Sequence, residues 1–154
     1  MSTTRITLPN ELMLGSVKEL LSEGQEVIIM TKGLSMLPFI EGKRDSVLLK
    51  KLESVVPGDI VLAELSAGHF VLHRVRTVEG ESLTLQGDGN LSGQEHCRLA
   101  DVAGTVLAIQ REGRADVDPR SPCQLRRWRR WTAFPYQVRR YYLALYRRIK
   151  HITI

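Results

Sequence analysis

The chain has 154 residues, of which 43% are hydrophobic and 25% charged, values near the average of globular domains that exclude wholesale disorder and fibrous repeats. Its longest apolar runs, such as residues 27–30, are far shorter than the roughly 20 residues that a membrane-spanning helix needs. Residues 1–9 lack the basic segment and the apolar stretch of a secretory signal peptide, so we expect a cytoplasmic protein.

The net charge of +5 is distributed unevenly along the chain. Residues 111–154 contain 12 Lys and Arg against 3 acidic residues, whereas residues 1–110 contain 10 against 14. Seven of the nine aromatic residues also lie beyond residue 127. The sequence therefore predicts two parts, a body at residues 1–115 and a basic, aromatic tail at residues 116–154.

The two cysteines, Cys97 and Cys123, have no second Cys or His at metal-ligand spacing, which argues against a disulfide framework and against a zinc site. His96 precedes Cys97 but lacks further ligands at a suitable spacing. The sequence Gly87-x-Gly89 is too short for a phosphate-binding loop. We therefore expect no metal and no cofactor.

The first predicted element is an amphipathic helix over residues 10–23, which Gly24 ends. Its apolar residues recur at helical spacing: Met13, Leu14, Val17, Leu20 and Leu21. Six β-rich segments follow between Gly, Pro, Asp and Asn turns: residues 26–31, 46–50, 60–65, 70–78, 83–86 and 102–110. This pattern predicts a mainly β, mostly antiparallel domain covered by the N-terminal helix, with a polar linker near residues 118–122.

The tail is predicted to form two helical pieces separated by Pro135. The second is amphipathic and basic, with apolar residues at helical spacing: Val138, Tyr142, Leu145, Ile149 and Ile152. The binding surface assigned to the tail is basic and aromatic: Arg126, Arg127, Trp128, Arg130, Trp131, Arg139, Arg140, Arg147 and Arg148. Three partners for this surface stay open, in order of preference: an anionic membrane, the domain itself or a protein partner, and nucleic acid. The first would place the protein peripherally at a membrane.

Ser35 lies in a predicted turn at residues 32–40, which follows an apolar strand and can hold the hydroxyl exposed. To act as a nucleophile, a serine needs a base within roughly 2.6–3.2 Å. His73 is embedded in a predicted strand, where alternation places it on the same face as Val71 and Val75. A buried, neutral imidazole suits a general base. The alternative is a core histidine and an unreactive turn serine.

Four ordered motifs resemble the S24/S26 serine peptidase superfamily, which includes the type I signal peptidases and the LexA-like repressors. The motifs are Gly33-x-Ser35-Met36-x-Pro38, Pro57-Gly58-Asp59-Ile60-Val61, His73-Arg74-Val75 and Gly87-Asp88-Gly89-Asn90. The resemblance covers roughly residues 27–110 and implies the signal peptidase/LexA-like β fold with Ser35 as the nucleophile. Bacterial signal peptidases use a lysine where this chain has His73, so the chain looks like the serine–histidine branch typified by the endoplasmic-reticulum and archaeal signal peptidases. In that branch the matching Asp88 would support the imidazole, with Asp101 as a second choice.

The resemblance implies that His73 takes the proton of Ser35 and returns it to the leaving amine. The main-chain N–H of Ser35 would bind the oxyanion, in a region that includes Gly33 and Met36. Some signal peptidases have a serine at the place of Gly33, so one oxyanion donor would be missing here. Met36 is expected to shape the turn, and Arg74 to point outward, solvated or paired with a carboxylate.

The predicted function is therefore a signal-peptidase-like serine endopeptidase that cleaves peptides or precursor proteins, with the Ala-x-Ala type of preference that the family implies. One alternative is a non-catalytic binding module on the same fold. Another is a LexA-like regulator that cleaves itself. The 34 residues before Ser35 argue against self-cleavage, because they contain no alanine for an Ala-Gly site and leave no room for a helix-turn-helix domain.

Overall fold

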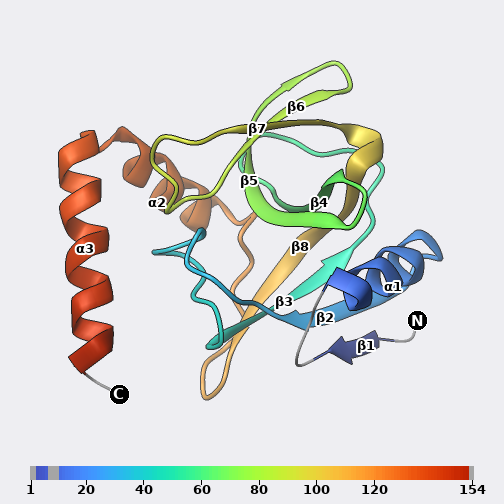
Figure 1. Cartoon of the computed structure of the whole chain (residues 1–154), viewed down its shortest axis with the longest axis horizontal. Helices are drawn as coiled ribbons and strands as arrows, with labels where there is room; N and C mark the ends of the chain where they lie inside the picture. Colours follow the sequence, from blue (N-terminus) through green and yellow to red (C-terminus); the bar gives the residue numbers. More distant parts are fainter. Residues whose placement is uncertain (1–2, 7–10, 153–154) are drawn as a thin grey trace.

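The computed structural model describes residues 3–6 and 11–152, and its strands form one eight-stranded sheet (Figure 1). In chain order the strands and the one 3-10 turn are β1 (Thr3–Ile6), β2 (Glu26–Met30), β3 (Asp45–Lys50), β4 (Ile60–Ser66), β5 (His69–Glu79), β6 (Ser82–Gln86), β7 (Glu95–Arg98), η1 (Leu99–Asp101) and β8 (Val102–Arg111). Across the sheet the order is β1-β2-β3-β8-β4-β5-β6-β7. β1 runs parallel to β2, and the other neighbouring strands are antiparallel. The prediction of a mainly β, mostly antiparallel body is confirmed.

Two of the strands, β1 and β7, were not predicted from the sequence. Each has four residues. β7 reads Glu-His-Cys-Arg, which lacks the run of β-branched and aromatic residues that marks a strand. Both segments are strands because an existing edge accepts them, β1 beside β2 and β7 beside β6.

Helix α1 (Glu11–Ser22) packs on one face of the sheet, as predicted (Figure 1). Val17 and Leu21 are fully buried in a core cluster formed with apolar residues of β2, β3, β4 and β8. Gly104 in β8 permits this close packing, since a Cβ atom there would lie 2.9 Å from Leu21 Cδ1. Asn10, the predicted first residue of the helix, lies outside the described residues.

A second core cluster lies on the opposite face of β4. Ile60 and Leu62 belong to the cluster under α1, whereas Val61 and Ala63 belong to the second cluster. This division follows from the alternation of side chains along a strand. The second cluster also contains apolar residues of β5, β6 and β7. The middle of the sheet is therefore buried on both faces.

The segment between β8 and the tail helices runs along the body. Val117 pairs with Ile109 of β8 through an isolated β-bridge. Arg120 Nε donates a hydrogen bond to Asp59 Oδ1 at 2.9 Å. Ser121 then caps the following helix with its side-chain oxygen. The polar segment predicted as a linker is therefore attached to the sheet.

Two helices complete the structure, α2 (Pro122–Ala133) and α3 (Tyr136–Ile152), and Pro135 lies between them as predicted. α2 lies between the body and α3, which stands at the edge of the molecule (Figure 1). Trp128 and Trp131 of α2 are buried. Among the described residues, no helix is both long enough and apolar enough to cross a membrane.

Candidate active site

Ser35 lies in the loop between β2 and β3, near the start of a helical turn over residues 34–40 in which the Leu37 N–H donates to the Leu34 carbonyl. Ser35 is exposed, whereas Met36 is buried. Within the described part of the chain, the backbone N–H groups of Ser35 and Met36 have no hydrogen-bond acceptor, as is usual for the first amides of a helical turn. The hydroxyl and these N–H groups could therefore bind a carbonyl oxygen of another molecule.

Two glycines, Gly33 and Gly42, lie where the two ends of this loop come together. Gly33 has a φ of +85°, a left-handed conformation that favours glycine. The Gly42 N–H donates to the Gly33 carbonyl at 3.1 Å, and a Cβ on Gly42 would lie 2.4 Å from both Gly33 N and Gly33 O. Gly33, predicted to belong to the oxyanion region, therefore contributes to the site through its backbone conformation.

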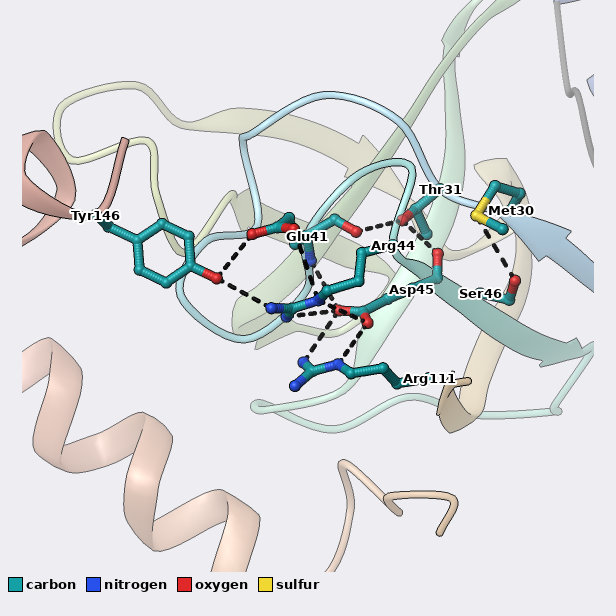
Figure 2. A network of polar contacts seen from close by, with 8 residues as sticks. All are labelled: Met30, Thr31, Glu41, Arg44, Asp45, Ser46, Arg111 and Tyr146. Carbon is teal, nitrogen blue, oxygen red and sulfur yellow. Dashed lines mark hydrogen bonds and ion pairs between the residues drawn. The ribbon is translucent and has the colours of Figure 1, made fainter. Parts of the chain in front are cut away.

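The base of the loop is held by an ion-pair network around the buried Asp45 (Figure 2). The fully buried Asp45 carboxylate pairs with Arg44 at 3.0 Å and with Arg111 at 2.8 Å, and it accepts a hydrogen bond from the Glu41 N–H at 2.9 Å. Thr31 Oγ1 donates to the Asp45 carbonyl at 2.7 Å. Because these groups come from the two ends of the loop and from β8, the network fixes where the loop leaves the sheet.

His73 lies on β5 and is buried, with 6% of its surface exposed. Its Nδ1 is 2.9 Å from Oε2 of Glu95, and Glu95 is the first residue of β7. When a neutral imidazole donates from Nδ1 to a carboxylate, its lone pair is at Nε2, and that nitrogen can accept a proton. Glu95 therefore fixes the orientation of the His73 ring.

Gly87 lies between Ser35 and His73. A Cβ atom on Gly87 would lie 2.4 Å from the Ser35 carbonyl oxygen and 3.2 Å from His73 Nε2, so both residues face this glycine. Ser35 and His73 also line the same cavity, which has a volume of about 210 Å³. Across residues 3–6 and 11–152, no hydrogen bond joins Ser35 Oγ to His73 Nε2. Such bonds are often long in a free enzyme and shorten when the substrate binds.

The carboxylate that binds His73 is Glu95, and the prediction that Asp88 does so is wrong. Both Asp88 oxygens accept hydrogen bonds from Arg74, at 3.2 and 2.6 Å. Burial raises the pKa of Asp88, and the guanidinium of Arg74 opposes that rise. Adjacent residues of a strand point to opposite faces, so a carboxylate that meets Arg74 is on the wrong face of β5 for His73. Asp101, the second choice, caps η1 instead.

The prediction that Arg74 points outward is wrong. Its predicted pairing with a carboxylate is found, in the ion pair with Asp88. It is 2% exposed, because α2 and the Ser35 loop cover its face of β5. The guanidinium carbon lies 5.2 Å from the ring centroid of Phe39 and 5.3 Å from that of Trp128. These contacts stabilise a buried cation that also has a carboxylate partner.

The turn at residues 87–89 contacts both the tail and the loop that carries Ser35. Trp131 Nε1 donates to the Asp88 carbonyl at 2.9 Å, and the Gly89 N–H donates to the Ser35 carbonyl at 2.8 Å. The assignment of Trp128 and Trp131 to a membrane-binding or partner-binding surface is therefore corrected, since both are buried against the body. α2 belongs to the framework that surrounds the site.

The cavity beside Ser35 and His73 is mostly apolar. It is bordered by α1, β2, β4, β5 and the Ser35 loop, and its apolar lining includes Leu14, Ile29, Met36, Ile40, Leu62 and Leu72. A pocket of this kind can accept an apolar side chain next to Ser35 and His73.

Comparison of the chain with protein-family models gives no match, and neither does comparison with curated proteins.

Proposed function

We propose that this chain is a serine endopeptidase of the S24/S26 type, with the signal peptidase/LexA-like fold, in which Ser35 is the nucleophile and His73 is the general base. One observation carries the proposal: an exposed Ser35 and a buried His73 line one cavity, and the His73 Nδ1 lies 2.9 Å from a carboxylate. The four ordered sequence motifs around Ser35, His73 and Asp88 support the same assignment.

In the proposed reaction, Ser35 Oγ attacks the carbonyl carbon of a peptide bond while His73 Nε2 takes the hydroxyl proton. The tetrahedral oxyanion accepts hydrogen bonds from the N–H groups of Ser35 and Met36, which have no other acceptor in the described chain. His73 then donates its proton to the amine as the C–N bond breaks. Water attacks the acyl-enzyme with the same histidine as base, which releases the acid and regenerates Ser35.

Glu95 takes the role that the sequence assigned to Asp88. Its carboxylate keeps the proton of neutral His73 on Nδ1 and stabilises the imidazolium that forms during the attack. Asp88 instead forms a buried ion pair with Arg74, and it directly follows Gly87, the residue that both Ser35 and His73 face.

The proposed substrates are peptides or precursor proteins that place an apolar side chain beside the scissile bond. The mainly apolar lining of the cavity next to Ser35 supports this substrate class. The family resemblance adds a preference for small residues of the Ala-x-Ala type, which a peptide library can test directly.

The experiment is mass-spectrometric detection of cleavage in an Ala-x-Ala peptide library that also contains larger apolar residues. Ser35→Ala and His73→Ala should each lower the cleavage rate by at least about a thousandfold. Ser92→Ala and His69→Ala are matched controls, because both residues are exposed, and these variants should cleave like the wild type. Cleavage that survives Ser35→Ala would refute the proposal. A wild type that cleaves no peptide would favour the non-catalytic binding module.

A further inference from the structure

Helix α3 has an exposed apolar face. Val138, Tyr142 and Leu145 recur at i, i+4 and i+7 and are 50%, 49% and 59% exposed, and Ile149 continues the row at 56%. Tyr141 lies next to this row and is 73% exposed. We call these five residues the apolar stripe of α3. Most of its surface would be in contact with water unless something covers it.

Except at its edge, where the Tyr142 ring lies 5.5 Å from the Trp131 ring, the stripe is not the face by which α3 is attached to the rest of the protein. Leu143 is 4% exposed and packs with Leu37 and Trp131. Tyr146 OH donates to Glu41 Oε1 at 2.7 Å and accepts from Arg44 Nη1 at 3.1 Å (Figure 2). These contacts hold the helix in one rotation, with the stripe turned outward. The fold therefore uses a different face of α3 and leaves the stripe available.

The surroundings of the stripe are strongly positive. No acidic residue follows Asp118 in the sequence. The tail helices have seven exposed arginines: Arg126, Arg127, Arg129, Arg130, Arg140, Arg147 and Arg148. In the part of the chain that the structure describes, none of these seven forms an ion pair. All seven arginines are therefore available to attract an anionic surface.

We propose that α3 docks the protein on an anionic lipid surface, with the apolar stripe in the boundary between head groups and acyl chains. Val138, Leu145 and Ile149 are aliphatic, so they partition into acyl chains, whereas Tyr141 and Tyr142 suit the head-group region. The exposed arginines of both helices bind lipid phosphates. Three of the five stripe residues are aliphatic and offer no stacking surface for bases, so lipid fits this surface better than nucleic acid does.

The test is sedimentation of the full chain with vesicles of phosphatidylglycerol and phosphatidylcholine, compared with vesicles of phosphatidylcholine alone. Binding should be at least about tenfold tighter to the anionic vesicles and should weaken in high salt. Leu145→Glu should weaken binding by at least about tenfold, because it puts a charge into the stripe. Ala144→Glu is the matched control: it adds the same charge at the neighbouring exposed position, outside the stripe, and should weaken binding less.

Three results would overturn the proposal: no binding of the wild type to anionic vesicles, equal loss of binding in Leu145→Glu and Ala144→Glu, or equal binding to both vesicle types. Binding to a single-stranded oligonucleotide that Leu145→Glu does not change, without vesicle binding, would assign the tail to nucleic acid. Thermal melting curves of both variants serve as the control that they are folded. The assay needs no catalysis, and Ser35→Ala should bind vesicles like the wild type, so its outcome is separate from that of the proposed peptidase activity.

Discussion

The β-rich body and the helical tail treat their apolar residues differently. In β4, alternate side chains enter two core clusters, so Ile60 and Val61 are both fully buried although they point in opposite directions. In the tail, α2 buries Trp131, whereas α3 buries Leu143 and leaves Leu145 exposed. The two tail helices therefore differ in role. α2 packs against the candidate active site, whereas α3 has a surface that the rest of the protein does not cover.

The largest expected effect concerns the histidine that the body supplies to the site. Glu95→Gln should lower the cleavage rate by about 10²- to 10⁴-fold, because an amide can present its N–H to Nδ1 and favour the wrong tautomer of His73. Cleavage rates of the two proteins, measured with the same peptide at the same pH, test this statement. A rate that Glu95→Gln leaves unchanged would remove Glu95 from the mechanism.

The second prediction concerns the buried ion pair of the body that contacts α2, Arg74–Asp88. Asp88→Ala leaves the Arg74 guanidinium buried without its carboxylate and should lower the free energy of unfolding by about 3–5 kcal/mol. Chemical denaturation monitored by tryptophan fluorescence measures the loss. The double variant Arg74→Met with Asp88→Leu removes both charges and should be more stable than Asp88→Ala. A loss below about 1 kcal/mol for Asp88→Ala would mean that the pair is not buried in solution.

The third prediction compares two leucines on α3 that are two residues apart. Leu143→Ala should lower the free energy of unfolding by about 2–4 kcal/mol, because Leu143 is buried against the body. Leu145→Ala should change it by less than about 0.5 kcal/mol, because Leu145 is exposed. Equal effects in denaturation experiments would contradict the orientation of the helix described above.

The smallest effect compares the two cysteines, one from each part. Burial raises the pKa of the Cys97 thiol to about 11, so Cys97 stays protonated when the pH rises from 7 to 9. Cys123 is exposed on α2 and should react with iodoacetamide much faster than Cys97 does. Mass spectrometry of the native protein should find one modified cysteine, Cys123, and both cysteines after unfolding. Early modification of Cys97 would contradict the packing of β7 on the body.

Much of the secondary structure was predictable from periodicity and turn residues. The amphipathic row of α1 and the β-rich segments of six strands are local signals, and Pro135 marked the break between the tail helices. Glu95 was missed because β7 is short and polar. A signal was present, since Glu95 alternates with Cys97 along β7, which puts a carboxylate on the same face as a buried thiol.

By itself, the sequence determined the elements whose side chains repeat at a regular spacing, the basic character of the tail, and Ser35 and His73 as candidates for chemistry. The choice of carboxylate was decided by the tertiary structure. Asp88 and Glu95 both lie near His73 in sequence, but strand alternation and the β6–β7 pairing direct one to Arg74 and the other to the imidazole. The tertiary structure also decided that α2 packs against the body while the apolar stripe of α3 stays exposed. Helical spacing identifies an apolar face, whereas the packing of Leu143 and Tyr146 selects which face the body covers.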